Sequence, residues 1–215
     1  KKAQLSNLKA HLYKQILVSL RLNPVNQNIR VQIREQLDFA TILYQKGLYK
    51  QSLKILDKAK SIAIENEEKN IAYEIVELEK VIETQYITRS IPDRADELAI
   101  QAKELSAQNV MTSKLSNLSL QLYGQMLKMG YVRSDKDYQF VKKYFESHLP
   151  KYKIEKLGFR EKLWLYKSYL WYSFLTQDFL SCYKYASKWT DLFYDHREMI
   201  FLNPVFYLKG NNYLL

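Results

Sequence analysis

Residues 39–59 read FATILYQKGLYKQSLKILDKA and contain two apolar stripes with a glycine between them. The first stripe ends at Leu43, and the second runs from Leu53 to Ala59. Spacings of three and four residues place each stripe on one face of an α-helix. Gly47 is the residue type that ends a helix in the left-handed conformation. The stretch therefore predicts two antiparallel helices joined by a short turn.

The same helical spacing continues along most of the chain. It predicts about ten helices of roughly 14 to 22 residues with short connections, including separate helices over 95–105 and 115–129. Proline, glycine and capping residues fall between the stripes, as expected of helix ends. The predicted boundaries are Asn23-Pro24, Gly47, Ser90 to Asp93, Gly130 with Ser134 or Asp135, Leu149-Pro150, Thr176 and Asn203-Pro204.

Composition agrees with an all-α chain. The 215 residues are 47% hydrophobic, which excludes an intrinsically disordered chain. Only 5 Gly and 4 Pro are present, too few for an all-β chain with frequent tight turns. The single cysteine, Cys182, excludes an internal disulfide and a multi-cysteine zinc site.

The stretch around Gly47 resembles a tetratricopeptide repeat. Phe39-Ala40 with Leu43 on the first helix, and Ser52, Leu56 and Ala59 on the second, match that pattern of small and large residues. Looser copies recur about every 40 to 44 residues, around Ala99, Gly130-Tyr131 and Ala186. The resemblance implies a right-handed α-α superhelix of antiparallel helix pairs. We expect one such domain over 1–215, cut from a longer array.

Charge leaves two interpretations open. The net charge is +10, and it comes from 25 Lys but only 8 Arg. Nucleic-acid readers favour Arg, whose planar guanidinium matches phosphate and guanine. The excess of Lys therefore indicates either a solvated surface or an anionic partner.

The repeat register also predicts a binding groove, because first helices line the concave face of such arrays. It places one set of first-helix side chains on that face. These partner-binding candidates are Arg34, Thr41, Tyr44, Lys80, Thr84, Asn117, Trp164, Lys167 and Trp171. The Lys and Asn positions at which some tetratricopeptide domains clamp a C-terminal carboxylate hold Leu37 and Thr41 here, so that clamp is not predicted.

Aromatic residues concentrate in the second part of the chain, where residues 111–215 hold 24 of them. Residues 164–174 are aromatic on every side of one predicted helix. Such a helix is either buried or presents a face to a partner. We place Trp164 and Trp171 in the groove and Tyr169 and Leu170 between helices, with a purely structural role as the alternative.

The sequence contains no common catalytic motif. The sequence holds no phosphate-binding glycine loop, no GxSxG elbow and no HExxH zinc pattern. We interpret Cys182 as a buried, inert thiol, residues 195–198 as a helix-end ion pair, and the acids in 74–83 as a solvated helix face. The sequence thus predicts no enzyme, cofactor or metal site.

These observations favour a cytoplasmic scaffold that binds a protein or peptide, preferentially an acidic one. No stretch is long and apolar enough to span a membrane. Two alternatives remain open: a regulatory or sensor segment of a larger signalling protein, and a basic helical array that binds nucleic acid. Oligomeric state is not predicted.

Overall fold

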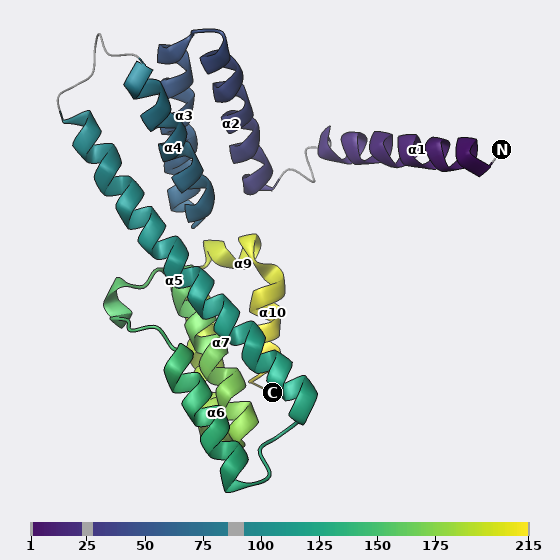
Figure 1. Cartoon of the computed structure of the whole chain (residues 1–215), viewed down its shortest axis with the longest axis vertical. Coiled ribbons are helices and arrows are strands. Elements are labelled where there is room, and N and C mark those ends of the chain that lie inside the picture. Colours follow the sequence, from purple (N-terminus) through teal and green to yellow (C-terminus); the bar gives the residue numbers. More distant parts are fainter. Residues whose placement is uncertain (1, 23–27, 86–92, 215) are drawn as a thin grey trace.

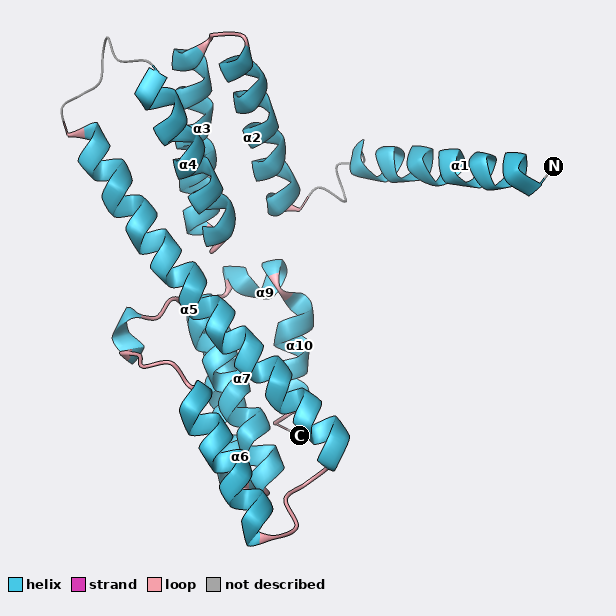
Figure 2. Ribbon diagram, in the orientation of Figure 1, coloured by secondary structure: helices cyan, strands magenta, loops and turns pink. Residues whose placement is uncertain are grey.

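The computed structural model describes residues 2–22, 28–85 and 93–214, and these residues form helices and short connections without any strand (Figures 1 and 2). Consecutive helices pack against one another in pairs. The elements are α1 (Lys2–Leu22), α2 (Ile29–Gln45), α3 (Tyr49–Glu65), α4 (Lys69–Gln85), α5 (Arg94–Met129), α6 (Asp135–His148), η3 (Ile154–Lys156), α7 (Phe159–Thr176), α8 (Phe179–Asp195), α9 (Glu198–Leu202) and α10 (Pro204–Asn212).

The α2–α3 hairpin forms as its sequence predicts. Asn28 caps α2 by accepting a hydrogen bond from the backbone N–H of Val31, at 3.1 Å. Gly47 ends the helix at a φ of 74°, which favours glycine. The small side chain of Ser52 allows close approach and donates a hydrogen bond to the carbonyl oxygen of Ala40, at 2.7 Å. Both residues are fully buried.

Helix α5 corrects the sequence analysis, because residues 94–129 form one helix of 36 residues instead of two separate helices. The stripe positions between Leu105 and Leu115 are occupied by the polar residues Gln108 and Thr112, which interrupt the apolar pattern. Both side chains are half-buried in the structure. No proline interrupts the segment, and Gly124 is its one glycine. The backbone therefore stays helical although the hydrophobic pattern is interrupted between residues 105 and 115.

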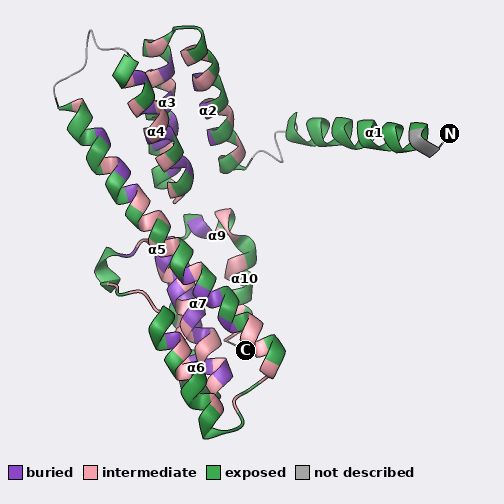
Figure 3. Ribbon diagram, viewed as in Figure 1, coloured by how far each residue is buried: buried purple, intermediate pink, exposed green. Residues whose placement is uncertain are grey.

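Two hydrophobic regions lie along α5 (Figure 3). The first half of the molecule, α2 to α4 with residues 94–105 of α5, shares one core in which Leu56, Ile75 and Leu98 pack together. The second half, residues 115–129 of α5 with α6 to α10, contains the remaining core clusters. The fully buried Trp189 belongs to the second half.

A charged junction of five residues, Glu67, Glu68, Lys69, Arg160 and Glu161, joins the two halves beside the middle of α5. Lys69 Nζ lies 3.2 Å from Glu161 Oε2, and Arg160 Nη2 lies 2.5 Å from Glu68 Oε1. Glu161 is almost completely buried. Polar residues in the middle of α5 therefore face polar neighbours, as the hydrogen bond from the Asn109 amide to the backbone oxygen of Lys69 illustrates.

Helix boundaries in the second half follow the predicted signals closely. Ser134 caps α6, accepting a hydrogen bond from the backbone N–H of Asp137, and α7 ends at the predicted Thr176. Pro204 is the first residue of α10. The short helix α9 was not predicted.

Helix α1 projects from the rest of the described chain (Figures 1 and 3). Residues 4–22 are exposed along its whole length, including the apolar stripe that contains Leu8 and Leu12. An ion pair of 3.8 Å between Arg21 and Asp38 links the end of α1 to α2. The predicted boundaries at Asn23-Pro24 and Ser90–Pro92 lie outside the described residues.

Candidate partner-binding cavities

Eight of the nine predicted groove residues line surface cavities. Arg34 and Thr41 line a cavity of about 490 Å³ beside α2, which we call the α2 cavity. Lys80 and Thr84 line one of about 660 Å³ between α4 and α5, the α4–α5 cavity. The third, of about 470 Å³ between α5, α7 and α10, is the aromatic cavity. It is lined by Ser116, Asn117, Ser119, Leu120, Tyr123, Trp164, Lys167, Trp171, Lys209 and Tyr213.

Tyr44 is the predicted groove residue outside these cavities. Its hydroxyl donates a hydrogen bond to Gln85 Oε1, at 3.0 Å. Its ring lies 5.8 Å from that of Tyr49. These contacts connect α2 with α3 and α4, so the observed role of Tyr44 is to join helices.

Charges at the α2 cavity are largely compensated within the chain. Arg34 forms an ion pair of 3.7 Å with Glu74, and Arg21 reaches Asp38. The hydroxyl of Thr41 donates to the backbone oxygen of Leu37, at 2.8 Å, a contact within its own helix. A ligand here would compete with existing partners for most of the polar groups.

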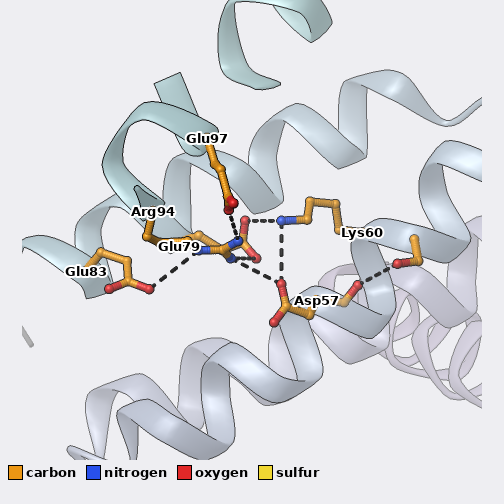
Figure 4. Close-up of polar contacts among 7 residues, drawn as sticks. Asp57, Lys60, Glu79, Glu83, Arg94 and Glu97 are labelled. Atoms are coloured by element: carbon orange, nitrogen blue, oxygen red, sulfur yellow. Dashed lines mark hydrogen bonds and ion pairs between the residues drawn. The ribbon is translucent and has the colours of Figure 1, made fainter. Parts of the chain in front are cut away.

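The α4–α5 cavity borders an ion network that sequence analysis missed (Figure 4). Lys60 Nζ lies 2.6 Å from Glu79 Oε2, and Arg94 Nη2 lies 3.4 Å from Glu79 Oε1. Arg94 also forms an ion pair with Asp57 at 3.2 Å. The expectation of a solvated acidic face on α4 is therefore wrong for Glu79, whose side chain is completely buried.

Burial governs the chemistry of Glu79. Loss of hydration raises the pKa of its carboxyl above the usual value of 4.5, while the hydrogen bond and attraction from Lys60 act in the opposite direction. Each of its carboxylate oxygens already forms an ion pair, one with Lys60 and the other with Arg94. A general base must reach its substrate, and Glu79 is fully enclosed, so we assign the network a structural role.

The aromatic cavity brings four predicted residues together. Asn117 comes from α5, and Trp164, Lys167 and Trp171 come from α7, where positions three, four and seven apart share a face. Lys167 Nζ lies 4.7 Å from the ring centre of Trp164, in cation–π geometry. Trp171 packs against Tyr123, with 4.8 Å between ring centres.

Lysine is the only ionised residue type among the described residues of this lining. Burial, and secondarily repulsion from Lys209, lower the pKa of Lys167 below its ordinary value of 10.5. The described part of the chain shows no ion pair between a carboxylate and either lysine. The site is a positively charged, partly dehydrated cavity with aromatic walls.

Two polar atoms of the same lining are buried without a hydrogen-bond partner, namely Ser119 Oγ and Trp171 Nε1. Ser119 is 1% exposed. An unpaired buried polar group costs about 1–3 kcal/mol. The cavity therefore contains unused hydrogen-bonding capacity as well as charge.

Residues of α7 divide between core and cavity. Trp164 and Trp171 are half-buried and line the aromatic cavity. Leu170 is fully buried, and Tyr169 stacks on Tyr185 of α8 with 4.4 Å between ring centres, so both lie between helices as predicted. Both tryptophans also pack against core clusters, so the alternative of a structural role stays open beside the groove prediction.

Other chemistry in the described residues is sparse. They contain no cluster of three or more His, Cys, Asp or Glu side chains able to hold a metal ion. Cys182 is buried, and burial raises the pKa of its thiol to about 11, as expected of an inert thiol. His196 pairs with Glu198 at 3.6 Å, at the start of α9. None of the described helices combines the length and apolar character that crossing a bilayer would need.

Sequence analysis missed six residues that complete the aromatic cavity: Ser116, Ser119, Leu120, Tyr123, Lys209 and Tyr213. The first four lie on the second half of α5, whose continuity was not predicted. Lys209 and Tyr213 lie in the last segment of the chain, where too few residues follow Pro204 to set a register. No family model matches the chain, and no curated protein or solved structure matches it.

Proposed function

We propose that the protein is a non-catalytic scaffold of tetratricopeptide-like hairpins, arranged as a right-handed superhelix, which binds an acidic protein or peptide segment. The observation that carries the proposal is the aromatic cavity. Four residues placed in a groove by the repeat register, Asn117, Trp164, Lys167 and Trp171, line it together.

Binding would use the aromatic side chains as anchors. Tryptophan and tyrosine bury a large area at a low cost in side-chain entropy, and they are frequent at binding hot spots. Trp164 and Trp171 have half-buried rings beside open volume. Lys167 and Lys209 add an attraction for acidic groups on the partner.

The partners of the buried carboxylates support a scaffold more than an enzyme. The buried carboxylates Glu79 and Glu161 already have partners, Lys60 and Lys69 respectively. The buried polar atoms left unpaired at the aromatic cavity are a hydroxyl and an indole N–H, which favour recognition over proton transfer.

Selection from a displayed library of short random peptides tests the proposal. The full chain serves as bait after nuclease treatment, and enriched peptides are measured by fluorescence anisotropy at several salt concentrations. We expect acidic peptides whose affinity falls at least about tenfold for the double variant Lys167→Glu/Lys209→Glu, since charge-assisted contacts contribute about 1.5–3 kcal/mol each.

The matched control is Lys184→Glu with Lys188→Glu, which changes the net charge equally on α8 outside the cavity lining. Peptides that bind both double variants alike would contradict the proposed site. A nucleic-acid array would instead bind single-stranded oligonucleotides, with affinity falling steeply as salt rises, and would enrich no peptide.

A further inference from the structure

The aromatic cavity contains hydrogen-bond donors in excess of acceptors. The ammonium groups of Lys167 and Lys209 donate only, and so does the indole N–H of Trp171. Asn117 and Ser119 can donate as well. No Asp or Glu occurs among its described lining residues. A ligand that complements the cavity must therefore accept hydrogen bonds and carry negative charge.

The position of Lys167 strengthens this requirement. Its Nζ lies 4.7 Å from the ring centre of Trp164 and 5.4 Å from that of Phe206. The rings offer a weak attraction, whereas a carboxylate would supply a full counter-charge in a partly dehydrated site. Lys209 is close enough to repel Lys167 electrostatically. An anion between the two ammonium groups would remove that repulsion.

Unpartnered buried groups provide independent evidence for a ligand. Ser119 is 1% exposed, and its Oγ has no partner. The indole N–H of Trp171 is buried and unpaired in the same lining. Ordinary folded proteins pair nearly all such groups. Oxygens of a bound ligand would pair them after a small rotation of each side chain toward the cavity, because neither atom has exposed surface in the unbound chain.

The shape and the side-chain chemistry select the kind of anion. No arginine occurs in the described lining, so bidentate recognition is absent and the two lysines act as point charges, which bind carboxylate as well as phosphate. The walls are apolar and aromatic, including Tyr123 and Tyr213. A volume of about 470 Å³ falls in the range of small-molecule pockets. These features favour a single carboxylate on an apolar body.

We propose that the aromatic cavity binds a carboxylate carried on an apolar or aromatic body, with Lys167 and Lys209 as counter-ions and Ser119 and Trp171 as hydrogen-bonding groups. The inference rests on the proposed function in that it uses one of the scaffold's cavities. The carboxylate belongs either to a free small organic acid or to the C-terminal residue of a bound partner.

Matched probes separate charge from shape. We would titrate the full chain with 3-phenylpropionate and with its uncharged amide by calorimetry. A second pair is a short peptide ending in phenylalanine, with a free and with an amidated C-terminus. The acid member of at least one pair should bind at least about tenfold more tightly than its amide, because a charge-assisted hydrogen bond contributes about 1.5–3 kcal/mol.

Two variants locate the binding. Lys167→Met keeps an unbranched side chain, removes the charge, and should weaken acid binding at least about tenfold. Its folding should not suffer, since the removed charge is partly dehydrated and unpaired. Lys184→Met is the control, since Lys184 also lies near an aromatic ring, 5.7 Å from the centre of Tyr185, but outside the cavity lining. It should bind as the wild type does.

The outcomes are separable. Binding of 3-phenylpropionate alone identifies a small-acid site even if peptide selection fails, whereas tighter binding of the free-ended peptide identifies a C-terminus. Selected peptides that bind equally well with an amidated end would support the scaffold but not the carboxylate. Equal affinity for acid and amide in both pairs, or unchanged acid binding by a folded Lys167→Met variant, would overturn the inference.

Discussion

Lys60 in the first half and Lys167 in the second are both largely withdrawn from water, but their charges are balanced differently. Lys60 Nζ lies 2.6 Å from a buried carboxylate, Glu79. Lys167 lies over Trp164, near a second lysine, and forms no ion pair with a described carboxylate. The comparison teaches that the charge of Lys60 is balanced by a carboxylate that joins α3 to α4, whereas the charge of Lys167 lacks a carboxylate partner among the described residues, which is why we propose that a ligand balances it.

The largest effect is expected from Lys60→Met. The change leaves Glu79 completely buried with only the longer contact to Arg94, at 3.4 Å. Breaking a buried ion pair from one side typically costs 3–5 kcal/mol. We expect the unfolding free energy, measured by urea denaturation, to fall by about 3 kcal/mol.

Lys50→Met is the control for that change, because Lys50 lies on the same helix, α3, and is exposed. Its effect should stay within about 0.5 kcal/mol. If both variants lost the same small amount of stability, the charge of Lys60 would not hold the first half together, and the contrast with Lys167 would disappear.

Glycine substitutions test the junction between the halves. A Cβ at Gly158 would collide with Lys69 Nζ and meet Glu161 Oε2 at 2.9 Å. Because the Lys69 ammonium would have to move away from the buried Glu161 to make room, Gly158→Ala should lower the unfolding free energy by about 1–2 kcal/mol. Gly124 in α5 has no atom within 4 Å of a built Cβ, so Gly124→Ala should raise it by about 0.5–1 kcal/mol. Thermal denaturation measures the direction of the stability change in each variant. If both variants gained stability, the close contact of Gly158 with the junction would be contradicted.

Two buried serines extend the comparison to uncharged groups. Ser52 Oγ donates to the Ala40 carbonyl oxygen at 2.7 Å, while Ser119 Oγ has no partner. Ser52→Ala should lower the unfolding free energy by about 1 kcal/mol, and Ser119→Ala should leave it unchanged or raise it by about 0.5 kcal/mol. Both residues lie in helices, so the gain in helix propensity is matched. If chemical denaturation showed that both variants lose the same amount of unfolding free energy, the hydroxyl of Ser119 would have to form a hydrogen bond in solution.

Periodicity predicted most of the helices because they are bounded by strong local signals. Gly47, Ser134 and Pro204 act within one or two residues of a helix end, and such effects are visible in sequence. The continuity of α5 was missed because the polar residues Gln108 and Thr112 interrupt its apolar stripe, beside Asn109, which donates a hydrogen bond to the backbone of Lys69 in the charged junction. That junction forms between segments about ninety residues apart, and hydropathy does not register such pairing.

Part of the candidate site could also be predicted from the sequence. Trp164, Lys167 and Trp171 share a helix face, so the repeat register alone places them together. Lys209 and Tyr213 reach the cavity only because α10 packs back beside α8, a tertiary contact with no local signature. The burial of Glu79 was missed for the same reason, since its cations come from α3 and α5.

The smallest expected effect concerns the pH dependence of the Glu79→Gln variant, because opposing influences act on this carboxyl. Burial raises its pKa above 4.5, and Lys60 partly offsets the rise. A carboxyl whose pKa is higher in the folded state stabilises the protein below its unfolded pKa and loses that contribution as pH rises through the folded pKa. Relative to Glu79→Gln, the wild type should thus lose stability as pH rises above about 4.5, through the raised pKa of the folded state.

Urea denaturation of both proteins at each pH measures this difference, and the glutamine variant supplies the reference for every other titrating group. A relative gain for the wild type would mean that the attraction of Lys60 exceeds the cost of burial. The ion network would then be a source of stability in itself. A relative loss means instead that the network mainly fixes how α3, α4 and α5 pack, because its ions are tolerated only when correctly paired.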